Sequence, residues 1–165
     1  MHDLRLRHDL SECPAYIRLA LKAAGIYNLV WGFVVILFPI SVFLLFDMQP
    51  PLYPQIWQCV GMIVGVYGIG YLIAAQNPFR HWPIILVGLL GKLFGPIGFL
   101  IAATRGELPW SWTVIIIFND LIWWVPFTHV LYLATKHNSD TTKATTSGTA
   151  EGEMLAMPEG VTSET

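Results

Sequence analysis

The chain has 165 residues, of which 55% are hydrophobic and only 12% are charged, and its mean hydropathy is +0.56. A soluble domain does not tolerate so apolar a composition, so the sequence predicts a membrane protein. The formal net charge of -2 arises at one end, because residues 137–165 hold five acids against one base. The rest of the chain is only slightly basic and offers no basic patch, which argues against a nucleic-acid partner.

Four apolar stretches follow a short charged head. Residues 1–15 form that head, predicted to be cytoplasmic, and Pro14 favours an interfacial helix that leads toward the first span. Crossing the hydrocarbon core takes roughly 20 apolar helical residues, and the stretches of that length are 23–46, 56–75, 83–103 and 112–134. The loops between them are too short to fold alone, so neighbouring spans should be antiparallel and in contact. Residues 16–135 are therefore predicted to form an all-α integral membrane domain, an antiparallel bundle of four transmembrane helices with short loops.

The positive charges predict an orientation for these spans. Lys and Arg are retained on the cytoplasmic side of short loops. On one side of the predicted spans lie Arg18, Lys22, Arg80 and Lys136. Only Arg105 lies on the other side, so both termini are expected in the cytoplasm. Residues 136–165 are rich in Thr, Ser, Gly and Glu, and we predict a disordered acidic cytoplasmic tail there.

Two ionisable residues lie inside the spans. Such a side chain costs at least about 2.5 to 3.5 kcal/mol in hydrocarbon, so it marks a candidate functional site. Lys92 lies near the middle of the third span and Asp120 near the middle of the fourth. In antiparallel neighbours their α-carbons should differ in depth by only roughly 6 Å, which a lysine stem can reach. The sequence predicts a buried Lys–Asp pair.

Aromatic and amide side chains are expected around this pair. Asp120, Trp123, Trp124 and Phe127 share one helical face, with Asn119 at its edge. If this face converges with the polar faces of the first two spans, the lining of a ligand pocket results. The predicted ligand-binding residues are Lys92, Asp120, Asn119, Trp123, Trp124, Asn28, Trp31 and Tyr67. The alternative is that the aromatic residues simply pack the bundle.

Proline and glycine add two expectations about the backbone. Pro96 has no N–H to offer the carbonyl of Lys92, and a freed carbonyl at membrane depth must be satisfied by protein, water or ligand. The pairs Gly61-x-x-x-Gly65 and Gly91-x-x-x-Gly95 are patterns that let helices approach closely, and Gly88 and Gly98 extend the second stripe.

Two short motifs carry a resemblance to a known group. The first span contains YNLVWG at residues 27–32, and the last contains NDLIWWVPF at residues 119–127. Over residues 16–135 the chain resembles the small four-span bacterial membrane proteins of the DoxX-like group. The resemblance implies a multi-pass protein of the bacterial inner membrane, and it implies no particular chemistry.

The expected function is that of a small integral membrane binding or accessory protein. Its partners would be the lipid bilayer and, in the polar pocket, an amphipathic small molecule or a helix of a membrane-protein partner. One alternative is a membrane-embedded enzyme for a lipid or quinone-like substrate, with Asp120 as acid or base; another is a purely structural bundle. The enzyme is disfavoured because no second carboxylate or histidine accompanies Asp120. No metal or cofactor is expected, since the cysteines and histidines lack ligand spacing.

Overall fold

The computed structural model describes residues 13–155, so most of the predicted head and the last ten residues lie outside the described part of the chain. Its elements are α2 (Ala15–Leu37), α3 (Ser41–Leu45), α4 (Pro54–Ala74), α5 (Trp82–Thr104), the 3-10 turn η1 (Trp110–Trp112), α6 (Thr113–Ile116), the π-helical turn η2 (Ile117–Leu121) and α7 (Ile122–Leu155). Four stretches are helical, long and apolar enough to cross a membrane: Ala15–Leu37, Pro54–Ala74, Trp82–Thr104 and Trp110–Ser139. The prediction of an all-α bundle with four transmembrane helices is confirmed.

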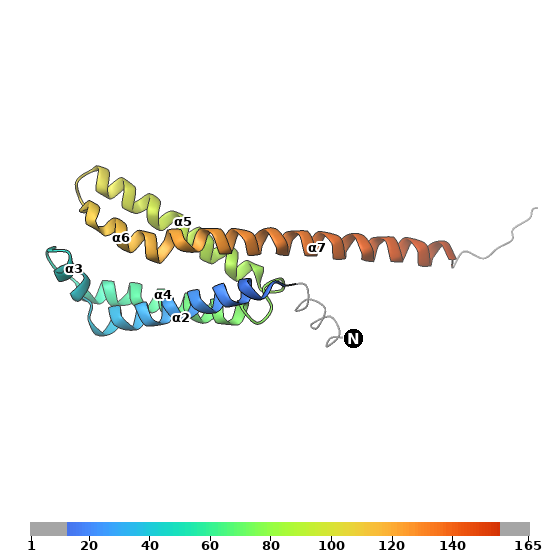
Figure 1. The fold of residues 1–165 in the computed structure, drawn as a ribbon, viewed down its shortest axis with the longest axis horizontal. Helices are drawn as coiled ribbons and strands as arrows, with labels where there is room; N and C mark the ends of the chain where they lie inside the picture. Colours follow the sequence, from blue (N-terminus) through green and yellow to red (C-terminus); the bar gives the residue numbers. More distant parts are fainter. Residues whose placement is uncertain (1–12, 156–165) are drawn as a thin grey trace, which may run out of the picture.

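The spans are arranged as two helical hairpins (Figure 1). Helix α2 lies along α4, and α5 crosses beside the continuous segment from α6 to α7. Contacts of α4 with α5 and of α2 with α7 join the two hairpins. Successive spans run in opposite directions, as their short loops require.

Glycines allow the first hairpin to pack backbone against backbone. A Cβ atom built on Gly32 would lie 2.5 Å from the carbonyl oxygen of Gly61 and 3.0 Å from the nitrogen of Gly65. One built on Gly68 would lie 2.8 Å from the carbonyl oxygen of Gly25. Only glycine permits such an approach. The prediction of close packing is confirmed at Gly61, whose Cβ would lie 2.9 Å from the carbonyl oxygen of Gly32, whereas a Cβ on Gly65 would meet nothing within 4 Å.

In α5 only Gly88 and Gly95 of the predicted glycine stripe make contacts. A Cβ on Gly91 would meet nothing within 4 Å, so the predicted Gly91-x-x-x-Gly95 packing face is wrong at its first member. Gly95 faces Asp120, and Gly88, seven residues earlier, faces the ring of Tyr71. The spacing that matters in α5 is therefore seven residues, two turns of helix along one face.

The first span lies earlier in the sequence than predicted. The apolar stretch 23–46 is one uninterrupted run, yet α2 spans Ala15–Leu37 and the chain restarts as α3. Pro39 follows the end of α2, and proline cannot supply the N–H that would continue the ladder. At its other end α2 begins directly after Pro14, so the expected interfacial helix is the first part of the span itself.

The last helix continues beyond the membrane-spanning part. Where the sequence predicts a disordered tail from residue 136, α7 runs on to Leu155. The chain has no proline between Pro126 and Pro158 to stop it. The hydroxyls of Ser139 and Thr142 each donate to the carbonyl four residues earlier, which is compatible with a helix.

Two apolar clusters fill the interior, one at each end of the bundle. The terminal cluster consists of Cys13, Ile17, Leu21, Ala24, Tyr71, Ala74, Ala75, Phe79, Ile85, Phe127, Val130 and Ala134. The loop cluster consists of Phe43, Phe99, Ala103 and Trp112, with partly buried neighbours that include Trp57. Along α5, Lys92 lies midway between Ile85 of the first cluster and Phe99 of the second. The polar residues thus occupy a layer between two apolar ends.

Candidate functional site

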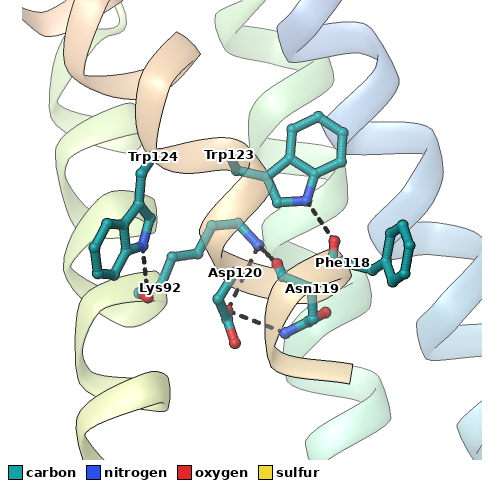
Figure 2. A network of polar contacts seen from close by, with 6 residues as sticks. All are labelled: Lys92, Phe118, Asn119, Asp120, Trp123 and Trp124. Atoms are coloured by element: carbon teal, nitrogen blue, oxygen red, sulfur yellow. Dashed lines mark hydrogen bonds and ion pairs between the residues drawn. The ribbon is translucent and has the colours of Figure 1, made fainter. Parts of the chain in front are cut away.

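A buried ion pair lies where α5 meets η2 (Figure 2). Lys92 and Asp120 are each 5% exposed, and the Nζ atom of Lys92 lies 3.9 Å from Oδ1 of Asp120. The same ammonium group donates a hydrogen bond to the main-chain oxygen of Asn119. The predicted Lys–Asp pair between the third and fourth spans is confirmed.

A π-helical turn supplies the carbonyl groups of this site. Within η2 the ladder widens, so that the N–H of Ile122 donates to the carbonyl of Ile117, five residues earlier. Two carbonyls in the turn accept side-chain donors: that of Phe118 from the indole of Trp123 at 3.1 Å, and that of Asn119 from Lys92. Sequence reasoning missed this turn, and its one signal is the polar pair at 119–120 inside an apolar span.

Trp124 supplies the hydrogen-bond donor that Pro96 lacks. Pro96 lies inside α5 and leaves the carbonyl of Lys92 without its usual intrahelical N–H. The indole Nε1 of Trp124 donates to that carbonyl at 3.0 Å (Figure 2). The freed carbonyl is satisfied by the protein, as membrane depth requires.

Neutral groups complete the surroundings of the two charges. The amide Nδ2 of Asn119 donates to Oδ1 of Asp120 at 3.1 Å. The other carboxylate oxygen faces Gly95, where a Cβ would lie 3.2 Å away. The Nζ atom of Lys92 lies 6.0 Å from the centroid of the Trp123 ring, a distance at which a cation is attracted to the aromatic face.

The first hairpin contributes less to the site than the sequence predicts. Trp31 packs edge-on against Trp57, with ring centroids 5.9 Å apart, and so belongs to the aromatic residues around the loop cluster. Tyr67 lies 6.3 Å from Tyr71 and packs on the terminal cluster. Within the described residues, neither the Trp31 ring nor the Tyr67 ring contacts the ion pair. The ring that α2 does bring to the site is Tyr27, 5.8 Å from Trp123.

Two amide oxygens of the spans are buried without a donor in the described residues. Asn28 of α2 is 2% exposed, and its Oδ1 accepts no hydrogen bond within residues 13–155. The Oδ1 of Asn119 is buried and likewise lacks a donor in the described part of the chain. Most buried polar atoms are hydrogen-bonded, so the Oδ1 of Asn119, beside the ion pair, and the Oδ1 of Asn28, next to Tyr27 on α2, are two spare acceptors.

The fold and the site define a multi-pass helical membrane protein that encloses an ion pair in a polar layer. Comparisons with known protein families, curated proteins and solved structures find no match for this chain.

Proposed function

We propose that this protein is a small integral membrane binding or accessory protein whose polar layer holds an amphipathic molecule. The observation that carries the proposal is the pair of buried amide oxygens, Asn28 Oδ1 and Asn119 Oδ1, which accept no hydrogen bond in the described residues. Leaving a buried acceptor unsatisfied costs about 1 to 3 kcal/mol. The amide nitrogen of Asn119 donates to Asp120, whereas a fold that needed Asn28 only for packing would be more stable with leucine at that position.

The spare atoms define the chemistry of the bound molecule. Amide oxygens only accept hydrogen bonds, so the molecule must present a donor such as a hydroxyl or an ammonium group. The aromatic rings of Tyr27 and Trp123 offer apolar surface for the rest of it. Both oxygens are buried inside the bundle, which favours a small molecule over a partner helix, because a partner helix would contact the outer surface.

The geometry favours binding over catalysis by Asp120. The polar contacts of its carboxylate are with Lys92 and Asn119, and neither is a second acid or a histidine that could share a proton. A second carboxylate or a histidine beside Asp120 would have favoured acid–base catalysis.

Asn28→Leu tests the proposal most directly. Leucine keeps the size of the side chain and removes the unsatisfied oxygen, so the variant should be at least as stable as the wild type while retaining less of the co-purifying molecule. Native mass spectrometry of the protein released from nanodiscs measures retention, and thermal unfolding measures stability. Asn138→Leu, at an exposed position of α7, is the matched control. If the Asn28→Leu variant is stabilised and still retains as much of the co-purifying molecule as the wild type, the binding proposal is wrong.

The proposal includes the bacterial inner membrane as location and a cytoplasmic position for both termini. Arg80 and Lys136 lie at one end of the spans, and Arg105 lies at the other. Reporters fused after Arg80 or Lys136 should be active in the cytoplasm, and a reporter inserted near Met48 should be active in the periplasm. A periplasmic signal after Lys136 would overturn the orientation.

A further inference from the structure

Two tryptophans at the loop end of the bundle have buried N–H groups with nothing to donate to. Trp57 of α4 and Trp112 of η1 lie with ring centroids 6.1 Å apart. Phe43 of α3 packs against both rings, at 5.3 and 5.6 Å. Both Nε1 atoms are buried, and neither meets an acceptor within residues 13–155. The two hairpins thus enclose a pair of unused donors.

Other tryptophans of the chain have a hydrogen-bond acceptor or are exposed. Trp123 and Trp124 both donate to main-chain oxygens, at 3.1 and 3.0 Å. Trp110 is 58% exposed, so its ring needs no internal partner. Trp112 is only 8% exposed and adjoins the same loop, yet its N–H remains unused. A buried donor in a folded protein normally has a partner.

We propose that Trp57 and Trp112 form a binding site for the acyl-ester carbonyl of a phospholipid. Indole nitrogen only donates, so the occupant must offer an acceptor. The side chains of the surrounding loop cluster are apolar, which favours a neutral carbonyl over a phosphate. Both residues lie at span ends, the level of the headgroup boundary, where phospholipid ester groups are found.

Helix α3 provides the route by which such a carbonyl reaches the donors. The five residues of α3 lie between two breaks in the helical backbone, the segment around Pro39 and the turn at Asp47. Asp47 has a φ of 52°, the left-handed region that ends helical structure. Because Phe43 contacts both rings, a displacement of α3 would uncover both indoles. This site is separate from the layer around Lys92 and does not depend on a molecule bound there.

The experiment compares two lipids that differ only in the carbonyl. The full chain, labelled with ¹⁵N-tryptophan, is placed in nanodiscs of a diester phospholipid or of its diether analogue with the same headgroup and chain length. Resonances of Trp57 and Trp112 are assigned with Trp57→Phe and Trp112→Phe. Their indole protons should shift downfield in the diester lipid only. Those of Trp123 and Trp124, which already donate to the backbone, should be the same in both lipids.

A second measurement separates the hydrogen bond from ring packing. Replacing Trp57 or Trp112 by 3-benzothienylalanine keeps the bicyclic ring and removes the N–H. The replaced protein should remain folded and should lose the phospholipid adduct seen by native mass spectrometry, whereas Trp110→Phe should keep it. The proposal is wrong if the indole protons shift equally in diester and diether lipid, or if both protons exchange rapidly with water. It is also wrong if only an added quinone shifts them, or if the benzothienyl proteins retain the phospholipid adduct.

Discussion

Neutralising one member of the buried ion pair should destabilise the protein more than neutralising both. The test uses Lys92→Met and Asp120→Asn, singly and together, because these changes remove charge while keeping most of the side-chain volume. Each single variant leaves a charge that is only 5% exposed without its counter-charge. The double variant leaves none, and replacing a whole buried pair is often close to neutral.

The structure gives a magnitude for each loss. In Lys92→Met the Asp120 carboxylate keeps only the neutral amide of Asn119 as a partner. The free energy of unfolding should therefore fall by roughly 3 to 5 kcal/mol, the loss expected when a buried pair is broken. In Asp120→Asn the ammonium keeps the main-chain oxygen of Asn119 and the face of Trp123, so the loss should be smaller. Two opposite unit charges about 4 Å apart, as Lys92 and Asp120 are, attract each other by about 4 kcal/mol at an effective dielectric constant of about 20. We therefore expect the loss in the double variant to fall short of the summed single losses by at least the larger single loss, roughly 3 to 5 kcal/mol.

The assay is reversible unfolding in bicelles by titration with sodium dodecyl sulfate, followed by circular dichroism. Lys22→Met provides the control, because Lys22 is exposed on α2. Combined with Asp120→Asn it should give additive losses to within about 0.5 kcal/mol. Additive losses for Lys92→Met with Asp120→Asn would refute the pairing, and equal losses in the two single variants would refute the asymmetry drawn from their remaining contacts.

The remaining predictions concern the backbone of the spans and use the same titration. Trp124→Phe leaves the Lys92 carbonyl without a donor and should cost about 1 to 3 kcal/mol. It should cost less in a Pro96→Ala background, whose restored N–H serves that carbonyl; equal costs in both backgrounds would contradict the hydrogen bond. Gly32→Ala should weaken the α2–α4 hairpin, because its Cβ would lie 2.5 Å from a carbonyl of α4. The new methyl group in Gly91→Ala meets open space, so this variant should be neutral or more stable by up to about 1 kcal/mol. Equal destabilisation by Gly32→Ala and Gly91→Ala would count against close packing of α2 on α4.

The number of spans and the ion pair could be predicted because each depends on position along the chain alone. Hydropathy and loop length determine how many helices cross and that neighbours are antiparallel. Depth then follows from residue number, so Lys92 and Asp120 could be placed at similar levels without knowing how either helix is rotated. The rotation of each helix about its own axis could not be predicted. The sequence therefore placed Trp31 at the ion pair, whereas its ring packs on Trp57.

Features that depend on tertiary compensation could not be predicted. Pro39 and Pro96 both lie in apolar stretches, yet the first follows the end of α2 and the second lies inside α5. Pro96 has Trp124, from another helix, to serve the carbonyl it frees. The π-helical turn at Ile117–Leu121 is of the same kind, because its carbonyls are served by side chains that meet only in the folded bundle.

The two hairpins divide the requirements of stability and chemistry between them. Helices α2 and α4 approach through glycines over their length, and neither contains an internal proline or a π-helical turn. The interruptions of the spans are gathered in the other hairpin, where Pro96, Pro126 and the turn at Ile117–Leu121 lie near the ion pair. Irregular backbone is costly in hydrocarbon and is retained where a site requires it. A change that forces α2 and α4 apart, such as Gly32→Ala, should therefore first reduce the amount of folded protein.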